Sequence, residues 1–413
     1  MNFNEFGFDP LLLEGIDAMN YKQATAVQEQ VIPIIRAGKD LIASAQTGTG
    51  KTAAFLLPII NELITTEKSE DDINALVIVP TRELAIQIAQ NLEAFSYFTP
   101  ISSIAVYGGG DGSSFENEKR ALSQGADIVI CTPGRMISHL AAGYVKIKNL
   151  KHLILDEADR MLDMGFYDDI MKIITHLPTE RQTLLFSATM PPKMRQMGLT
   201  ILRNPEQINI SISKPPEKII QKAYIVYEPQ KIPLIISILK NDQHKKIIVF
   251  CSRIESVKTL SRDLNRIGVK NEAVHSSLEQ SERENALLNF RTGRTKIIVA
   301  TDVLSRGIDI EDIDLVINFD VPNDGEDYVH RIGRTARAET DGTAITLVSE
   351  AEQYKLSVIE DLLGHPVPKA ELDASFGPVP AYQPERKIKK KSFGKPSFKR
   401  KGGSGNAHKK PNK

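Results

Sequence analysis

Three acidic side chains follow a short apolar run in the segment LILDEADRML, residues 153–162. The run 153–155 is typical of the end of a buried strand, because it is too short for a helix. Asp156, Glu157 and Asp159 come within the next four residues. Unpaired carboxylates at the tip of a buried strand cost free energy, so we expect a divalent cation to neutralise them. Taken alone, a solvated acidic loop explains the segment equally well.

A glycine-containing segment upstream has the pattern of a phosphate-binding loop. It follows the apolar run 40–44 and precedes the helical run 53–57, which is the strand–loop–helix context that such a loop requires. Ala45 stands where the general pattern has its first glycine. The loop consists of Ala45, Gln46, Thr47, Gly48, Thr49, Gly50, Lys51 and Thr52.

The residue types in this loop suit a nucleoside triphosphate. Gly48 and Gly50 let backbone N–H groups approach phosphate oxygens, and the start of the following helix adds its dipole. Lys51 can reach the terminal phosphates, and the Thr52 hydroxyl can bind Mg²⁺. An isolated match of this kind could be an ordinary turn, but together with the acidic segment it predicts a nucleoside triphosphatase.

The composition bounds the class of protein. A chain of 413 residues is expected to form two or three domains, and 41% hydrophobic with 25% charged residues is typical of a soluble globular protein. No apolar run approaches the ~20 residues that span a bilayer, and the N-terminus lacks the pattern of a secretion signal. Cys131 and Cys251 lie in apolar runs, so we expect buried free thiols and a cytoplasmic protein with no membrane partner.

Charge is distributed unevenly along the chain. Residues 386–413 hold 12 Lys and Arg and no Asp or Glu, so the remaining residues hold 52 acidic and 40 basic side chains. A basic tail of this kind is usually disordered and binds polyanions, and Phe393 and Phe398 could stack on bases. A tail that serves only solubility is the alternative.

Short apolar runs alternate with helical segments, and polar or glycine-rich residues follow each run directly. In doubly wound α/β sheets such residues collect at the carboxyl edge of the strands, where ligands bind. The pattern fades around 204–218 and then restarts without a second phosphate loop. We therefore expect an α/β fold with a first domain at 1–208, a linker at 209–219, a second domain at 220–370 and a tail at 371–413.

Two further groups of residues suit a nucleotide. Arg331, Arg334 and Arg337 in HRIGRTAR lie near one face of a helix, which favours an anionic partner, although solvated surface arginines are the alternative. Tyr21 could stack on a base, and Gln28 could read the N6 and N7 edge of adenine. By spacing alone this signal is weak, since a tyrosine and a glutamine at a helix start are usually ordinary surface or core residues.

Taken together, the motifs over about residues 1–365 resemble those of the DEAD-box ATP-dependent RNA helicases of superfamily 2, most like the bacterial RhlE-type branch. They occur in family order: Phe3 with NYKQATAVQ, AQTGTGKT, PTRELA, Gly108-Gly109, TPGR, DEAD, SAT, IIVFCSR, QSER, ATDVLSRGID and HRIGRTAR. The resemblance implies two RecA-like doubly wound parallel-sheet domains in tandem, followed by the basic disordered tail.

The resemblance also implies a role for each matching residue at the nucleotide. Adenine would be held by Phe3, Tyr21 and Gln28. Phosphates and Mg²⁺ would be bound by Lys51 and Thr52. Asp156 would orient Mg²⁺ through water, and Glu157 would position and deprotonate the attacking water. From the second domain, the nucleotide would be contacted by Gly307, Asp309 and the arginine fingers Arg334 and Arg337.

Further roles concern RNA and the link between the two ligands. Ser187 and Thr189 would couple the ATP site to RNA and to domain closure, and Arg331 would be more structural. The RNA backbone would be held by Thr81, Arg82, Gly109, Thr132, Arg135, Arg253, Arg283 and Thr301. The chain departs from the family pattern at Ala24, Leu304 and Ala336, and none of these changes removes a catalytic group.

We therefore expect RNA-stimulated ATP hydrolysis coupled to closure of the two domains and local unwinding of short duplexes. Ribosomal particles or the RNA-decay machinery would be the partners of a monomeric enzyme, by resemblance only. A DNA-translocating helicase and a non-catalytic RNA clamp that uses ATP as a switch are the rival hypotheses. DNA stimulation of the ATPase would favour the first, and failure to turn over ATP would favour the second.

Overall fold

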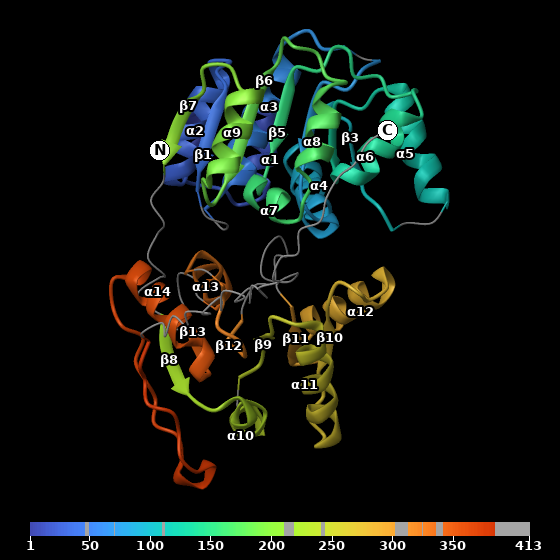
Figure 1. The fold of residues 1–413 in the computed structure, drawn as a ribbon. Helices are drawn as coiled ribbons and strands as arrows, with labels where there is room; N and C mark the ends of the chain where they lie inside the picture. The colour runs from blue at the N-terminus through green and yellow to red at the C-terminus, as the bar shows by residue number, and fades with distance from the viewer. Residues whose placement is uncertain are drawn as a thin grey trace, which may run out of the picture.

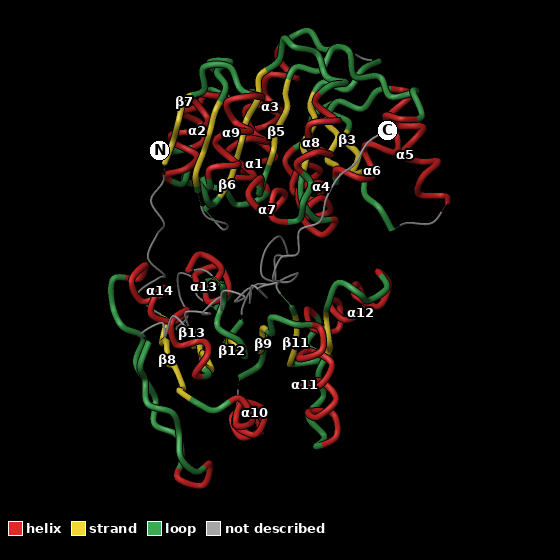
Figure 2. The backbone as a smooth tube through the Cα atoms, viewed as in Figure 1, coloured by secondary structure: helices red, strands yellow, loops and turns green. Residues whose placement is uncertain are grey.

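The computed structural model describes residues 1–45, 49–69, 71–109, 112–209, 219–240, 244–301, 313–323, 325–335 and 342–384. Two parallel sheets in separate lobes make up this part of the chain (Figure 1). Helices lie against the faces of both sheets, as the tube in Figure 2 shows. The predicted tandem of doubly wound α/β domains is confirmed.

The first sheet has the strand order β3-β4-β2-β5-β6-β1-β7. Its strands are β1 (Leu41–Ser44), β2 (Ala75–Ile78), β3 (Ser103–Val106), β4 (Ile128–Cys131), β5 (His152–Leu155), β6 (Gln182–Ser187) and β7 (Glu206–Asn209). Alternate side chains of β2 enter different cores: Ala75 and Val77 face one, and Leu76 and Ile78 face the other. Apolar residues on both faces explain why these strands read as continuous apolar runs.

The helices of the first lobe pack on these two faces. They are η1 (Phe3–Phe6), α1 (Pro10–Ala18), α2 (Ala26–Arg36), α3 (Lys51–Thr65), α4 (Arg82–Phe95), α5 (Gly112–Gln124), α6 (Pro133–Ala141), α7 (Ala158–Asp163), α8 (Tyr167–Ile174) and α9 (Pro192–Ile201). Thr25 caps α2 and Thr81 caps α4, each through a hydroxyl that accepts a backbone N–H of the first turn. Because β1 and β2 are parallel strands of one sheet, the polar loops that follow them lie at the same edge.

The second sheet has the strand order β10-β11-β9-β12-β13-β8. Its strands are β8 (Ile219–Ile225), β9 (Ile247–Phe250), β10 (Glu272–Val274), β11 (Ile297–Ala300), β12 (Leu315–Asn318) and β13 (Gly342–Val348). Its helices are η2 (Glu228–Gln230), α10 (Lys231–Lys240), α11 (Ile254–Arg266), α12 (Gln280–Arg291), α13 (Gly325–Ile332), η4 (Glu350–Glu352), α14 (Gln353–Leu363) and η5 (Ala374–Phe376).

The segment after α14 differs from the sequence prediction. Residues 371–384 were assigned to the tail, but they lie against the second lobe, since Gln230 Nε2 donates to Phe376 O and Pro378 O and Tyr382 Oη donates to Glu360 at 2.7 Å. These hydrogen bonds follow no periodic pattern, which explains the error. The predicted linker lies almost wholly, and the basic tail entirely, outside the described residues.

Two expectations from composition can be compared with the fold. Cys131 and Cys251 are buried and neither forms a disulfide, as predicted. Across the described ranges, every helix is too short or too polar to cross a bilayer.

Candidate functional site

The phosphate loop joins β1 to the start of α3. Gly50 caps α3 with a φ of +87°, and a Cβ added there would lie 2.5 Å from Gln28 Nε2, so glycine is required. Lys51 is 6% exposed, and its Nζ donates to Ala45 O at 2.7 Å, across the base of the loop. The unsatisfied N–H groups of the first turn of α3 face an anion in such a loop. Gln46, Thr47 and Gly48 lie outside the described residues.

Gln28 supports this loop from α2. Its Nε2 donates to Gly50 O at 3.1 Å, and its Oε1 accepts the Thr25 N–H at 2.8 Å. The Thr25 hydroxyl donates to Thr49 O at 2.8 Å. The glutamine expected to read adenine thus also positions the phosphate loop, which sequence spacing did not show. Contact with a base stays a prediction.

The two aromatic residues predicted to hold adenine lie next to each other. The ring centroids of Phe3 and Tyr21 are 6.0 Å apart, and Tyr21 meets Phe95 edge-on at 5.3 Å. Phe3 is 3% exposed and packs on Phe6 as well. The pair therefore forms part of the core beside α2.

The acidic residues after β5 are buried. Asp156 is 3% exposed, and its Oδ1 accepts the Glu157 N–H at 2.9 Å. Burial raises the pKa of Asp156 to about 6, while the positive charge of Lys51 opposes the rise. The positive charge of the phosphate-loop lysine thus acts on this carboxylate. A buried carboxylate near one cation suits a site that gains a further positive charge when occupied.

Glu157 adopts a backbone conformation that non-glycine residues avoid. Its φ is +50°, and it stands as the N-cap of α7 without a side-chain cap bond. A left-handed residue of this type costs about 1–2 kcal/mol. Such strain is found at functional sites, where the fold over-determines it. Its side chain is 6% exposed, and Oε2 lies 3.5 Å from Arg160 Nη1.

Asp159 connects the acidic segment with the segment after β6. Its Oδ2 accepts the Thr189 N–H at 3.0 Å and the Thr189 hydroxyl at 3.1 Å. Ser187 Oγ donates to Thr189 O at 2.7 Å and accepts the Asp159 N–H at 3.3 Å. Ser187 and Thr189 were predicted to couple two ligands, whereas Asp159 was given no role. Its place as the third acid of the cluster was the available signal.

Three of the predicted RNA-binding residues, Thr81, Arg82 and Gly109, lie at the start of α4 or in the loop after β3. Arg82 Nη1 donates to Gly108 O at 2.9 Å, and its guanidinium lies over Tyr107. Gly109 has a φ of +88°, and a Cβ there would lie 2.3 Å from Arg82 Nη1. The Thr81 hydroxyl accepts the Leu84 N–H at 3.3 Å and so serves as a cap.

Arg135 is held from a neighbouring helix. Its Nε donates to Glu118 at 2.6 Å, and its guanidinium lies 4.6 Å from the Phe115 ring centroid. Glu118 also contacts His139 Nε2 at 2.7 Å. Thr132 is the N-cap of α6 without a side-chain cap bond.

Some of the buried polar atoms without a hydrogen-bond partner in the described part of the chain belong to predicted RNA-binding residues, and others, such as Arg181 Nε and Asn271 Oδ1, do not. Arg82 Nε, Arg135 Nη2, Arg283 Nε and Thr301 Oγ1 are buried atoms without a hydrogen-bond partner in the described part of the chain. Such atoms are uncommon in folded proteins, because each costs about 1–3 kcal/mol. Three of the four are cationic donors, so an anionic ligand fits them.

The two lobes contact each other through predicted RNA-binding arginines. Arg283 Nη1 of α12 donates to Glu83 Oε1 of α4 at 2.7 Å, and both side chains are nearly buried. Arg82 Nη2 lies 3.5 Å from Glu284 of α12, whose side chain is 54% exposed. Each of these contacts thus joins a predicted RNA-binding arginine to a glutamate of the other lobe.

The arginine-rich segment HRIGRTAR is described as far as Thr335. Arg331 is 1% exposed, and its Nη1 donates to Asn318 Oδ1 and Asp320 O, each at 3.2 Å. Arg334 is half-buried after α13. Arg253 is an exposed N-cap of α11. Gly307, Asp309 and Arg337 lie outside the described residues, as do Leu304 and Ala336.

Comparison with protein families finds matches over most of the chain. Residues 25–197 match the family "DEAD/DEAH box helicase", and residues 230–339 match "Helicase conserved C-terminal domain". The chain is 42% identical over 360 residues to the ATP-dependent RNA helicase CshA of Listeria monocytogenes, which covers 87% of this chain and 68% of that protein. It is 38% identical over 371 residues to the ATP-dependent RNA helicase DbpA of Bacillus subtilis, which covers 90% of this chain and 76% of that protein.

Among solved structures, the chain is similar to Dbp5 of S. cerevisiae bound to RNA and ADP BeF3. The TM-score is 0.81 at 28% sequence identity, and the match covers 91% of this chain and 96% of that one. The similarity extends over both lobes.

Proposed function

Because the chain belongs to the DEAD-box family of ATP-dependent RNA helicases, we propose that RNA stimulates its ATP hydrolysis by closing the two domains on one strand. The observation that carries this proposal is the division of the site. Lys51, Asp156 and Glu157 belong to the first domain, whereas Arg334 belongs to the second. Hydrolysis then depends on the two domains coming together, and the product is local unwinding of a short duplex or remodelling of an RNA–protein particle.

In the proposed nucleotide site, both the phosphate loop and the acidic segment contribute binding residues. Lys51 and the N–H groups at the start of α3 would bind the phosphates. The Thr52 hydroxyl and the buried Asp156 carboxylate would hold Mg²⁺, in the case of Asp156 through water, and oxygen donors suit this cation. Bound Mg²⁺ would neutralise charge on the phosphate oxygens. Adenine would lie against Phe3, Tyr21 and Gln28.

Glu157 is the proposed general base. It would orient the attacking water and accept its proton, and the strained backbone at this residue supports a functional constraint. Arg334 would stabilise the charge that develops on the γ-phosphate, with Arg337 as the second finger and Gly307 and Asp309 as further contacts. Catalytic arginines contribute about 10³–10⁵ in rate for phosphoryl transfer.

RNA would bind along the edge that carries the unsatisfied donors. We propose that phosphate and sugar contacts come from Thr81, Arg82, Gly109, Thr132, Arg135, Arg253, Arg283 and Thr301. Contacts of this kind are largely independent of base sequence. Dbp5 was solved with RNA and a nucleotide analogue together, which supports simultaneous binding of both ligands.

Asp159 would transmit the state of the nucleotide to this edge. It joins the acidic segment to Thr189, and Ser187 joins both by hydrogen bonds. Coupling between ligands is reciprocal, so ATP should tighten RNA binding as RNA accelerates hydrolysis.

The cellular setting and the branch within the family are proposed on resemblance. The compact core and basic tail suggest the RhlE-type branch, whereas similar curated bacterial proteins carry the names CshA and DbpA. A monomeric cytoplasmic enzyme that acts in ribosome assembly or RNA turnover fits either branch.

The variant Glu157→Gln tests the proposed base. It should bind ATP and RNA with wild-type affinity, but turnover should fall by about 10²–10⁴ because the water is no longer deprotonated. Single-turnover ATPase and RNA-binding assays measure the two properties separately. Glu180→Gln is the matched control, since the Glu180 side chain is 90% exposed. Wild-type turnover in Glu157→Gln would exclude Glu157 as the base.

A further inference from the structure

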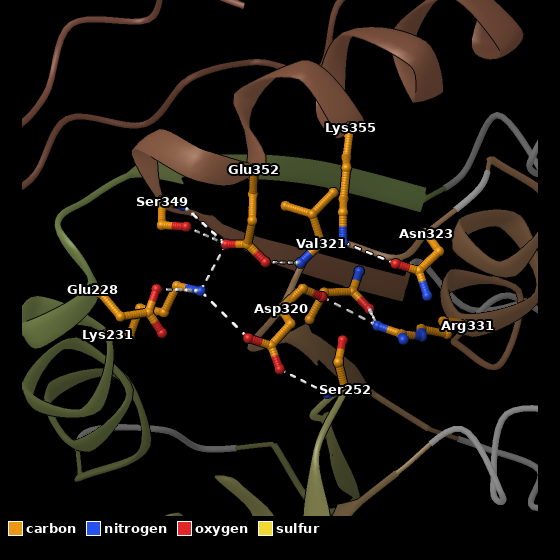
Figure 3. Close-up of polar contacts among 11 residues, drawn as sticks. Glu228, Lys231, Ser252, Asp320, Val321, Asn323, Arg331, Ser349, Glu352 and Lys355 are labelled. Atoms are coloured by element: carbon orange, nitrogen blue, oxygen red, sulfur yellow. Dashed lines mark hydrogen bonds and ion pairs between the residues drawn. The ribbon is translucent and has the colours of Figure 1, made fainter. Parts of the chain in front are cut away.

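A buried lysine lies at the start of α10, outside the proposed ATP and RNA sites. The Lys231 side chain is 0% exposed, and its Nζ lies 2.7 Å from Glu352, 3.1 Å from Glu228 and 3.5 Å from Asp320 (Figure 3). Burial disfavours the charged form, but the carboxylates outweigh it and raise the pKa of Lys231. The ammonium group is therefore charged and fully paired.

Asp320 links this lysine to residues of the proposed site. One carboxylate oxygen contacts Lys231, and the other accepts the Ser252 N–H at 2.6 Å. The Asp320 carbonyl accepts a hydrogen bond from Arg331 of α13. Figure 3 shows Asp320 between Lys231, Ser252 and Arg331. Ser252 directly precedes Arg253, a proposed RNA ligand.

Glu352 also holds the turn after β12, to which Asp320 belongs. Its Oε1 accepts the Val321 N–H at 3.0 Å, and its Oε2 contacts Lys231 and accepts the Ser349 hydroxyl at 2.6 Å. The turn after β12 is thus fixed by two carboxylates that share one lysine. Asp320 is thereby presented to Ser252 in one orientation.

The position of Arg253 depends on this arrangement. Within the described residues, its exposed side chain makes no hydrogen bond, so the backbone on both sides of it, Ser252 before it and α11 after it, sets its location. The Ser252 N–H is the donor that Asp320 holds. Buried ion pairs add little net stability compared with apolar residues, so the contribution of this network is fixed geometry.

We propose that Lys231 and Asp320 are positioning residues that hold the Ser252–Arg253 backbone where Arg253 can bind an RNA phosphate. The inference rests on the proposed role of Arg253 in RNA binding. Lys231 orients the Asp320 carboxylate, and Asp320 fixes the Ser252 N–H. The measurable consequence of this link is RNA binding through Arg253.

The variant Asp320→Asn tests the link, since it removes the carboxylate and keeps the carbonyl that binds Arg331. The RNA concentration at half-maximal ATPase should rise about tenfold, while kcat at saturating RNA and KM for ATP stay within about twofold of wild type. A purely structural loss would lower thermal stability and kcat together. Arg253→Ala, measured in parallel, should raise the same RNA concentration at least as much.

Glu228→Gln is the matched control. It removes another carboxylate from Lys231, but Glu228 is 62% exposed and lies in η2, the short helix directly before α10. Its RNA dependence should equal that of wild type. An equal effect of Glu228→Gln and Asp320→Asn, or an unchanged RNA dependence in Asp320→Asn, would overturn the proposal. If Arg253→Ala leaves RNA binding unchanged, its proposed role is wrong and this inference falls with it, although RNA-stimulated hydrolysis can still stand.

If Asp320→Asn does not fold, hydrogen exchange in the unmodified protein tests whether Asp320 holds the Ser252 backbone. The Ser252 amide, held by Asp320, should exchange at least about tenfold more slowly than the Arg253 amide at the start of α11. Equal exchange of the two amides would show that Asp320 does not hold this backbone, which overturns the proposal.

Discussion

Breaking the ion pair between Glu83 and Arg283 should weaken RNA binding by the nucleotide-bound enzyme. This pair joins α4 of the first domain to α12 of the second at 2.7 Å. A double-mutant cycle with Glu83→Gln, Arg283→Gln and the double variant separates the pair from other contacts of Arg283, including those with RNA. Glutamine keeps the length of glutamate and removes the charge.

The expected coupling energy follows from the geometry. The two side chains are 13% and 11% exposed, so solvent screens the pair weakly. Hydrogen bonds between charged groups contribute about 1.5–3 kcal/mol, and part of this is offset by desolvation. A coupling of about 1–2 kcal/mol is therefore expected, which corresponds to roughly five- to thirtyfold in affinity.

Fluorescence anisotropy with a labelled single strand and a non-hydrolysable ATP analogue measures the affinity. The cycle Arg82→Gln with Glu284→Gln is the control, because this pair lies at 3.5 Å with Glu284 54% exposed, and exposed pairs contribute about 0–1 kcal/mol. A coupling near zero for Glu83 and Arg283 would refute the view that their contact helps the domains close on RNA.

Two other predictions concern protonation and the tail. Without nucleotide and divalent cations, Asp156 binds a proton more tightly in the folded state, with a pKa of about 6 against 3.8. The folded protein therefore loses up to about 3 kcal/mol of stability as pH rises through 4–6. The variant Asp156→Asn should raise Tm more at pH 7 than at pH 4. An equal change in Tm at both pH values would contradict the raised pKa of Asp156. Deleting residues 386–413 should weaken RNA binding and reduce its salt dependence by about 0.7 in the slope for each lost phosphate contact, with ATP hydrolysis at saturating RNA retained; an unchanged slope would reject a direct tail contact.

The two-sheet architecture could be predicted because its signals are local. Runs such as 128–131 and 153–155 are apolar on both faces, and polar residues follow them at once. The phosphate loop and the acidic segment were recognisable for the same reason. Both depend on residues close together in the sequence.

What escaped prediction depends on residues far apart. Gln28 reaches Gly50 across 22 residues, and Arg283 reaches Glu83 across 200. In the sequence, Lys231 looks like an ordinary surface lysine, because its partners Asp320 and Glu352 come from other elements. Pairings of this kind follow from tertiary packing and have no periodic signature.

In the proposed mechanism, RNA brings the two parts of the ATPase site together. Steady-state ATP hydrolysis by the full chain, with saturating ATP and Mg²⁺, should be slow without nucleic acid and should rise by at least about tenfold with a saturating RNA strand. A DNA strand of the same sequence should stimulate much less. Equal hydrolysis rates with and without RNA would contradict the account.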